Sequence, residues 1–502
     1  MKILLRCFLL FAAVSFSFAF HPLFCQETVN AVIPGDFADP SIIKKGNQYY
    51  AVGTSSEWAP HFPVYTSADL LDWKPAGYVF DKAPAWTSGS FWAPEYYFYN
   101  NTYFIYYTAR RKTDNVSCIG VATSRYPDKG FTDHGVIIAY GKEAIDAFVY
   151  NDNGQRYITF KAFGLDERPI EILGTRLSAD GLHTEGAVFS LLKDDQRIGL
   201  EGQSILKKDN YYYLFYAAGN CCGISCDYNV RVARSGSLKG PYEVYPGNPI
   251  LQENAGWKCA GHGSFITANN NKHYYLHHAY NKLSGVFAGR QALLAELTWP
   301  QENGWPVFTS VATGKIDQGI HDAFKTAKIA RHWQWDFRHA MPVIKQVNGN
   351  FQLSGTVTAN NQTGIVATVR PSWGAFEASA TVVNHNSALK GLAFYGDANS
   401  ALGIGVRNDS IELWIVKDSS RTIAAVRNIN GPGPIVLKIS LLPDKTCRFF
   451  FKQGQDNWQE ITTAEKISAG FLPQWDRSPR IGLHYKGDAG KSAVFSSFDL
   501  TY

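Results

Sequence analysis

The chain has 502 residues, of which 45% are hydrophobic and 14% aromatic, and its formal net charge is +5. This length exceeds that of one compact domain and predicts two or three. The sequence has no long basic run or clustered basic helix, which argues against a nucleic-acid-binding protein. The aromatic excess is typical of β-rich folds and also of sugar-binding sites, and composition alone favours the structural explanation.

Residues 1–25 have the pattern of a signal peptide. Two basic side chains precede an apolar stretch, and Ser17-Phe18-Ala19 offers the small residues that a signal peptidase prefers. Cleavage nearer Cys25 is an alternative, although a lipoprotein anchor on Cys25 is disfavoured because bulky Phe24 precedes it. No later segment is long and apolar enough to span a bilayer. We therefore expect an exported, soluble protein, either secreted or periplasmic.

One motif recurs five times along residues 26–314. Each copy has a polar or aromatic head residue, a short apolar strand, a turn rich in Asn, Asp, Gly or Lys, and an aromatic strand. The head precedes the aromatic strand by about ten to twelve residues, and the copies recur about every 50–60 residues, as in repeat folds. The five heads are Asp39, Trp92, Asp146, Glu201 and His262.

Each copy has the pattern of a β-hairpin. A single hairpin cannot bury both of its faces, so neighbouring copies must stack, and five units arranged radially form a five-bladed β-propeller over residues 26–314. The inner strand of each blade then lines the central axis, and equivalent positions converge at one end of the channel. The repeat therefore predicts three acids and a histidine around one pocket.

The repeat ends near residue 314, and we expect residues 315–331 to be a linker. Residues 332–502 contain alternating strands with a different period, such as SIELWIVKD and TCRFFFKQG. This pattern predicts a β-sandwich domain. The chain as a whole is thus predicted to be all-β, with a five-bladed β-propeller followed by a β-sandwich.

Two carboxyl groups that face each other across a pocket can cleave a glycosidic bond. One donates a proton to the leaving oxygen, while the other is ionised and activates water or attacks carbon. A third carboxylate nearby disfavours ionisation of the acid and raises its pKa. Asp39, Asp146 and Glu201 supply such a set, whereas any one of them alone would be explained as a turn or cap residue.

Export makes disulfides permissible. The segment NCCGISC could suggest a zinc site, but a second thiol or histidine pair at ligand spacing is missing. We expect local disulfides in this loop instead, and the pairing stays open. The cysteines concerned are Cys221, Cys222, Cys226 and Cys259, and Cys118 and Cys447 lie elsewhere.

The propeller segments resemble glycoside hydrolase family 43. The matching motifs, in order, are ADPSII, FWAPE, IDAFVYNDNGQRYITF, EGQSILKKDNYYYLFYA and GHGSF. The resemblance implies hydrolysis with inversion, in which Asp39 is the general base, Glu201 is the general acid, and Asp146 tunes Glu201 and helps to hold the sugar. Base and acid in an inverting site lie roughly 6.5–9.5 Å apart, which leaves room for water.

The resemblance also implies residues that bind substrate or metal. His262 matches a family histidine near the axis that sometimes ligates calcium or a water cluster, and a water-linked structural histidine is the alternative. Arg290 matches an arginine that reaches the sugar near the acid, with a surface ion pair as the alternative. Trp92 is expected to form a wall of the pocket or to pack, and Trp58 and Phe163 to border its mouth. No cofactor is required, and calcium held through water at His262 is the one metal implied.

Residues 332–502 resemble the concanavalin-like sandwich that follows the propeller in family β-xylosidases and arabinofuranosidases. WQWD and FSSFDLTY carry this match. In such relatives the sandwich lends a loop to the pocket and closes it for exo-action, and a carbohydrate-binding module or a stabilising role are the alternatives. The Cys-rich loop AGNCCGISCDYNV departs from the simplest members, which leaves the sugar open.

The leading hypothesis is an exported exo-acting α-L-arabinofuranosidase or β-D-xylosidase that acts on arabinose- or xylose-containing plant glycans. The alternatives are an endo-arabinanase, a non-catalytic glycan-binding propeller and a scaffold for protein partners. The three aligned acids argue against the last two. The pentose, the linkage and the oligomeric state stay open.

Overall fold

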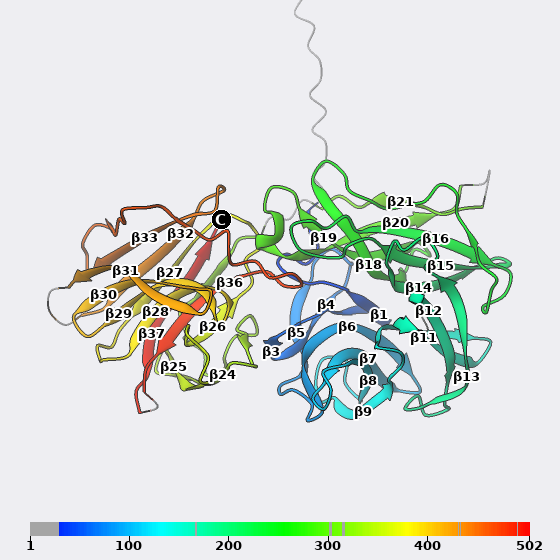
Figure 1. Cartoon of the computed structure of the whole chain (residues 1–502), viewed down its shortest axis with the longest axis horizontal. Helices are drawn as coiled ribbons and strands as arrows, with labels where there is room; N and C mark the ends of the chain where they lie inside the picture. The colour runs from blue at the N-terminus through cyan, green and yellow to red at the C-terminus, as the bar shows by residue number, and fades with distance from the viewer. Residues whose placement is uncertain are drawn as a thin grey trace, which may run out of the picture.

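A computed structural model describes residues 30–502 except 166–167, 301–303, 314–316, 430, 432 and 489. The predicted signal peptide therefore lies outside the described residues. Within these ranges the chain is all-β, and its one helical element is the 3-10 helix η1 (Gly285–Ala288). No helix of the described part is long and apolar enough to cross a membrane. The chain forms an N-terminal region of five small sheets and a C-terminal region of two larger ones (Figure 1).

Each sheet of the N-terminal region contains four antiparallel strands that follow one another in sequence. The first sheet has β1 (Ser41–Lys45), β2 (Gln48–Val52), β4 (His61–Ser67) and β5 (Lys74–Phe80). The second has β6 (Thr87–Tyr99), β7 (Thr102–Arg111), β8 (Ser117–Ser124) and β9 (Thr132–Ile138). The third has β10 (Glu143–Asp152), β11 (Gln155–Leu165), β12 (Arg168–Leu177) and β13 (Thr184–Lys193).

The fourth and fifth sheets follow the same pattern. The fourth has β14 (Leu200–Lys208), β15 (Tyr211–Ala218), β16 (Asn229–Ser235) and β17 (Glu243–Val244). The fifth has β18 (Trp257–Thr267), β19 (His273–Asn281), β20 (Arg290–Thr298) and β21 (Val307–Ser310). Every predicted hairpin is thus the first strand pair of one sheet.

Two-residue turns close several of these hairpins. Tyr99 pairs with Thr102, so Asn100 and Asn101 form the turn, with φ angles of 47° and 54°. The turn between β10 and β11 is Asn153-Gly154, whose φ angles are also positive. Asparagine and glycine tolerate this left-handed conformation, which matches the twist of the flanking strands. The local sequence therefore sets the register of each hairpin.

The first strands of the five sheets form a closed ring. β1 contacts β6, β6 contacts β10, β10 contacts β14, β14 contacts β18, and β18 contacts β1 again. Buried Glu95 on β6 links three of them, because it accepts hydrogen bonds from Ser41 Oγ at 2.7 Å and from the Val149 backbone N–H at 3.2 Å. The five head residues lie on these first strands or immediately before them, so the ring brings them together.

The C-terminal region has a nine-stranded and a six-stranded sheet. The nine-stranded sheet contains β22 (Ile320–Asp322), β24 (Ala340–Val347), β25 (Asn350–Val357), β27 (Phe376–Val382), β32 (Ile435–Leu441), β33 (Thr446–Gln453), β34 (Gln459–Glu460), β35 (Ile467–Ser468) and β37 (Ala493–Thr501). The six-stranded sheet contains β26 (Ile365–Val369), β28 (Leu389–Asp397), β29 (Ser400–Arg407), β30 (Ser410–Lys417), β31 (Ser420–Asn428) and β36 (Arg480–Lys486).

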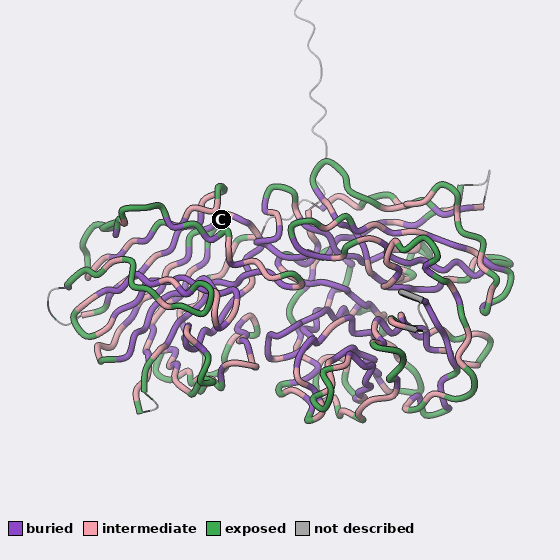
Figure 2. Tube along the Cα trace, viewed as in Figure 1, coloured by how far each residue is buried: buried purple, intermediate pink, exposed green. Residues whose placement is uncertain are grey.

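Apolar side chains of both larger sheets share one buried core, which includes Leu392, Ile404, Leu437 and Phe498. In Figure 2 the central strands of this region are largely purple, which marks buried residues, and the loops around them are largely green, which marks exposed residues. The segment expected to be a plain linker contributes a strand, because β22 pairs with β37. β3 (Trp58–Ala59) and β23 (Trp335–Asp336) pair with each other and join the two regions.

Candidate active site

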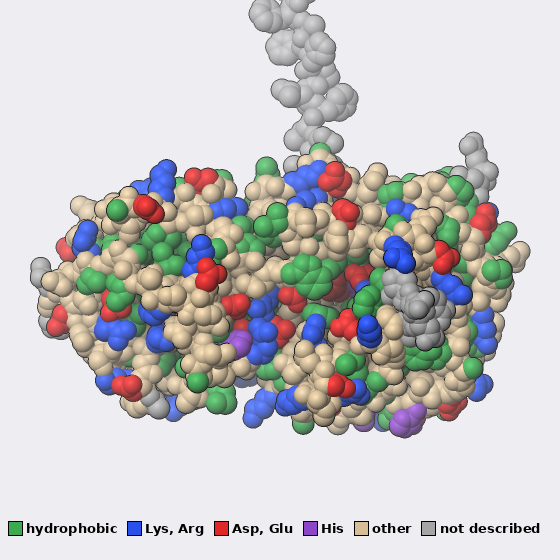
Figure 3. All heavy atoms as spheres, viewed as in Figure 1, with side chains coloured by type: hydrophobic (Ala, Val, Ile, Leu, Met, Phe, Trp, Pro, Cys, Tyr) green, Lys and Arg blue, Asp and Glu red, His purple; other side chains and the backbone are tan. Residues whose placement is uncertain are grey.

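A pocket of about 320 Å³ opens where the head residues meet. Its lining includes the head residues Asp39, Trp92, Asp146, Glu201 and His262. Figure 3 shows a hollow on this face near the junction of the two regions, with acidic side chains in red inside it. The structure therefore brings together residues that are far apart in the sequence.

Irregular backbone aims the head side chains into the pocket. The strand register shifts between Ile145 and Phe148 in β10, and between Glu201 and Ser204 in β14. Asp39 and Asp146 have φ angles of 50° and 59°, which a non-glycine residue adopts only at a cost of about 1 kcal/mol. Such bulges turn a side chain away from the regular alternation of the strand, and here they direct the carboxyl groups inward.

Position 202 requires glycine because of its backbone conformation and its close contact with His262. Its φ is +59°, and a Cβ atom there would lie 2.7 Å from Cγ of His262. A side chain at this position would therefore push the histidine ring out of place. The glycine after the acid in EGQS thus allows the fourth and fifth sheets to approach each other.

Asp39 is surrounded by groups that favour its ionised form. Arg290 Nη1 lies 3.2 Å from Oδ1, and Thr54 Oγ1 donates to Oδ2 at 2.6 Å. Burial raises the pKa of Asp39, but the charge of Arg290, with help from His278 and His262, holds that pKa well below its ordinary value. Asp39 is therefore a carboxylate at neutral pH, as a general base must be.

Two neighbouring side chains hold Glu201 as a carboxylate. Lys161 Nζ lies 2.7 Å from Oε2, and Tyr228 Oη donates to Oε1 at 2.8 Å. Burial raises the pKa of Glu201, but the ion pair with Lys161 and the two hydrogen bonds outweigh it, so the pKa is lowered. Both carboxylate oxygens accept a hydrogen bond, which leaves the acid without its proton.

Of the three acids among the head residues, Asp146 retains a proton most readily. Burial raises its pKa to about 6, against the attraction of His262, and the negative charge of Glu201 adds to the rise. We expected Asp146 to raise the pKa of Glu201, and this was wrong because the charge of Lys161 outweighs that effect and lowers the pKa. Glu201 is therefore the more readily ionised of the two acids, and Asp146 is the one whose protonated form is favoured.

Sequence reasoning missed Lys161. It lies in β11 opposite Ile145, in the aromatic strand YITFKAF, and its side chain is 15% exposed. Burial lowers its pKa, but the charges of Glu201 and Asp146 reverse this effect and raise the pKa above its ordinary value. A single charged residue inside an otherwise apolar strand was the available signal.

His262 lies between two of the acids. Its Nδ1 is 3.6 Å from Asp39 Oδ1 and 3.8 Å from Asp146 Oδ2. Among the described residues, no group of three or more His, Cys, Asp or Glu side chains is arranged to hold a metal ion. A direct protein cage for calcium therefore does not fit this site, and calcium held through water stays a prediction.

Arg290 is part of the pocket wall and not a surface residue. Its side chain is 5% exposed, and besides Asp39 it contacts the backbone carbonyl of Asp476 through Nη2 at 3.2 Å. Trp92 also lines the pocket, and its Nε1 donates to Asp476 Oδ2 at 3.0 Å. Trp475 and Asp476 belong to the loop between β35 and β36, so the C-terminal region contributes directly to the pocket.

Two residues expected at the pocket mouth do not line it. Trp58 is 1% exposed and packs against Tyr395 and beneath the Arg480 guanidinium, which lies 4.1 Å from the ring centre. This burial between the two regions excludes contact with a substrate, so the binding role expected for Trp58 was wrong. Phe163 is 41% exposed and pairs with Glu143, but only Glu143 lines the pocket.

The Cys-rich loop carries two disulfides. Cys221 is bonded to its neighbour Cys222, and Cys226 is bonded to Cys259 on β18. Cys118 and Cys447 are buried free thiols. The expectation of a local disulfide in this loop is confirmed for Cys221–Cys222, whereas Cys226 pairs outside the loop; all four sulfurs are in disulfides, which compete with zinc coordination.

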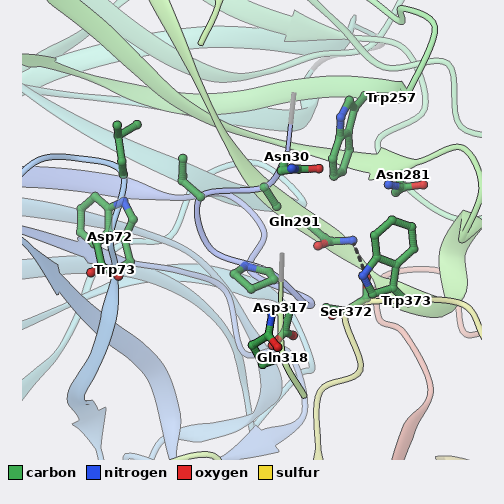
Figure 4. Close-up of a pocket in the computed structure, with 14 residues that line it drawn as sticks. Asn30, Asp72, Trp73, Trp257, Asn281, Gln291, Asp317, Gln318, Ser372 and Trp373 are labelled. Carbon is green, nitrogen blue, oxygen red and sulfur yellow. Dashed lines mark hydrogen bonds between the residues drawn. The ribbon is translucent and has the colours of Figure 1, made fainter. Parts of the chain in front are cut away.

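A second cavity of about 220 Å³ lies between the two regions. Figure 4 shows Trp73, Trp257 and Trp373 around it, and a hydrogen bond of 3.0 Å from Gln291 Nε2 to the Ser372 carbonyl. The two carboxyl groups that line it belong to half-exposed Asp72 and Asp317. It has no buried pair of acids, so the first pocket is the candidate active site.

Known proteins are similar to this chain, most of them over the N-terminal region that contains the candidate active site. The family described as Glycosyl hydrolases family 43 matches residues 28–306. An extracellular exo-α-(1→5)-L-arabinofuranosidase, ArbA of Cellvibrio japonicus (strain Ueda107), is 28% identical over 57% of this chain and 89% of its own length. A β-xylosidase of Bacillus subtilis (strain 168) is 25% identical over 89% of this chain and 93% of its own length.

Solved structures extend the similarity in fold to both regions. The family 43 protein BlXynB from Bacillus licheniformis has a TM-score of 0.78 and 21% identity over 94% of this chain and 99% of its own. A xylan β-1,4-xylosidase from Bacillus halodurans C-125 has a TM-score of 0.80 and 20% identity over 94% of this chain and 100% of its own. With its family match over more than half its length, this chain belongs to glycosyl hydrolases family 43 and is a glycoside hydrolase.

Proposed function

We propose that this hydrolase removes terminal arabinofuranosyl or xylosyl units from plant polysaccharides or oligosaccharides, as an exo-acting α-L-arabinofuranosidase or β-D-xylosidase. The observation that carries the proposal is a pocket that contains Asp39, Asp146 and Glu201 and is walled by Trp475 and Asp476. The names of the relatives, arabinofuranosidase and β-xylosidase, support pentose glycans as the substrate class.

The proposed architecture is a five-bladed β-propeller over residues 26–314, a connection over 315–331, and a concanavalin-like β-sandwich over 332–502. The closed ring of first strands supports the propeller, because each four-stranded sheet then corresponds to one blade. The core shared by the two larger sheets supports the sandwich.

The proposed mechanism inverts the configuration at the anomeric carbon. Asp39, ionised by Arg290, removes a proton from water as the water attacks. Glu201 donates a proton to the leaving oxygen, and it gains that proton when the substrate displaces Lys161 and the pKa of Glu201 rises.

Exo-action is favoured by the wall from the C-terminal region. Asp476 is bonded to Trp92 through its carboxylate and to Arg290 through its backbone carbonyl. A polysaccharide chain that continued past the sugar beside Asp39 would have to displace these contacts.

The proposed location is outside the cytoplasm, either secreted or periplasmic. The two disulfides of the Cys-rich loop are typical of oxidising compartments. Two relatives are named as extracellular enzymes. The reaction as proposed uses side chains and water alone, so no cofactor enters it.

Hydrolysis of nitrophenyl α-L-arabinofuranoside and nitrophenyl β-D-xyloside tests the proposal. We expect turnover of at least one of them, inversion by proton NMR of the first product, and loss of turnover in Asp39→Asn, because water must be activated whatever the leaving group. Binding of pentose oligosaccharides without turnover in the wild type would instead favour a glycan-binding protein.

Digestion of linear arabinan separates exo-action from endo-action. An extracellular endo-α-(1→5)-L-arabinanase of Bacillus subtilis (strain 168) is 27% identical over 54% of this chain and 87% of its own length. Endo-action on arabinan is therefore the alternative that the experiment must exclude. Early release of monosaccharide only is expected for exo-action. Early release of mixed oligosaccharides would overturn it.

A further inference from the structure

The disulfide between adjacent residues Cys221 and Cys222 lies in the wall of the candidate active site. Both residues line the pocket that contains Glu201. They belong to the loop 219–228, which connects β15 with β16. Apart from Tyr228 at its end, this loop has no role in the mechanism described above, so the role of the disulfide at the pocket is unassigned.

The loop begins and ends beside the proposed general acid. Glu201 pairs with Ala217 on β15, and the loop starts two residues later. At the other end, Tyr228 Oη donates a hydrogen bond of 2.8 Å to Glu201 Oε1. A general acid faces the leaving-group oxygen, so the loop borders the side of the pocket from which the leaving group departs.

Cys221 and Cys222 give the loop a small apolar patch at the pocket, beside the polar side chain of Asn220. A disulfide has no hydrogen-bond donor, and the neighbouring Gly223 lies against Trp475, since a Cβ atom at Gly223 would be 3.6 Å from Trp475 Cδ1. Trp475 is 62% exposed although it lines the same pocket. Its indole face is therefore accessible to a ligand that enters the pocket, and aromatic rings supply a large apolar contact area.

The loop is held rigidly. The second disulfide, Cys226–Cys259, ties it to β18, and the Asn220 backbone N–H donates to Asp227 Oδ1 at 2.7 Å. The ring that joins Cys221 to Cys222 removes further freedom from the two residues at the pocket wall. A surface fixed before binding loses little conformational entropy when a sugar packs on it.

We propose that the Cys221–Cys222 disulfide and Trp475 form a leaving-group subsite, which binds the apolar C–H face of the second sugar unit of an oligosaccharide substrate. This inference rests on the proposed function and names the part of the site that recognises the leaving sugar. The polar groups around Asp39 and Arg290 then bind the terminal sugar. This division predicts that substitutions can weaken the binding of one sugar unit without weakening the binding of the other.

The test compares two ligands in the double variant Cys221→Ala/Cys222→Ala. A pentose disaccharide occupies both subsites, whereas the released free pentose occupies only the terminal-sugar subsite. We expect the KM of the disaccharide to rise about tenfold, the size of effect that loss of an apolar contact gives. The inhibition constant of the free pentose is expected to stay within twofold of the wild-type value.

Trp475→Ala is the second variant, and it guards against misfolding because the side chain is exposed. It is expected to give the same selective rise in KM. Cys447→Ala removes a buried thiol of the C-terminal region and serves as the matched control, with both constants unchanged. Unchanged disaccharide KM in both test variants, or an equal weakening of disaccharide and free pentose, would overturn the subsite.

The same measurements separate this inference from the proposed function. A wild-type protein that cleaves no pentoside would remove both. A wild type that cleaves pentosides, together with test variants of unaltered disaccharide KM, would remove only the subsite.

Discussion

The two ends of the active-site pocket hold their carboxylates in different ways. At the Asp39 end, the compensating charge comes from Arg290, whose guanidinium is fixed by further contacts to the C-terminal region. At the Glu201 end, it comes from Lys161, a flexible side chain whose ammonium has Glu201 as its hydrogen-bond partner. An arginine fork holds a permanent carboxylate, whereas a lysine can swing away. The general base is therefore held permanently ionised, whereas the general acid can lose its compensating charge when a substrate binds.

The largest expected effect comes from removing either carboxylate. Asp39→Asn should lower kcat about 10³-fold on every substrate, because no other group can activate the water. Glu201→Gln should lower kcat by a similar factor on oligosaccharides but by much less on aryl glycosides with acidic phenols, whose leaving groups need little protonation. Steady-state kinetics on a series of phenols checks this. Equal leaving-group dependence in the two variants would contradict the assignment of base and acid.

A smaller effect is expected when the fixed cation is removed. Arg290→Met should lower kcat/KM about 10²-fold, because Asp39 loses both charge and position. Arg290 holds the pKa of Asp39 down, so its loss raises that pKa, and activity should disappear at a higher pH as the solution is acidified. The pH profile of kcat/KM measures the shift of the acidic limb.

Arg290→Lys is the matched control for this change. It keeps the charge and should leave the acidic limb near its wild-type position while kcat/KM still falls. An acidic limb that does not move in Arg290→Met would show that another group ionises Asp39.

Removing the charge of Lys161 should shift the basic limb of the pH profile of kcat/KM. Lys161 lowers the pKa of Glu201, so Lys161→Met raises that pKa, and Glu201 keeps its proton to higher pH. The basic limb of the kcat/KM profile is therefore expected to move to higher pH, with a modest change in the maximal rate. Lys161→Arg retains a charge at this position and is expected to keep the wild-type limb, whereas a shift of the limb to lower pH in Lys161→Met would contradict the ion-pair argument.

The smallest catalytic effect is expected outside the pocket, at Trp58. Trp58→Ala should leave kcat and KM at 25 °C close to wild type, because the indole lies between the two regions. Its loss should reduce the free energy of unfolding by about 3–5 kcal/mol through the cavity that remains. Denaturant unfolding monitored by fluorescence measures this. A large rise in KM with unchanged stability would restore the binding role that burial excludes.

The candidate site was predictable to the extent that it follows the repeat. Asp39, Asp146 and Glu201 occupy matching positions in the sequence, and the ring of first strands brings all three to one pocket. Lys161 occupies no repeat position, and its effect depends on the 2.7 Å contact with Glu201. Trp475 and Asp476 were also missed, since a loop more than 200 residues from Glu201 reaches the pocket only through the packing of the two regions.

By itself, the sequence determined the hairpins, their turns and the set of inward-facing head residues. These depend on local preferences, such as glycine and asparagine at positive φ and alternating aromatic strands, which act over a few residues. Only the tertiary structure decided which carboxyl group holds the proton, which tryptophans meet the pocket and which cysteines pair. Those properties depend on burial and on charges a few ångströms apart, and such distances arise only after distant segments have packed together.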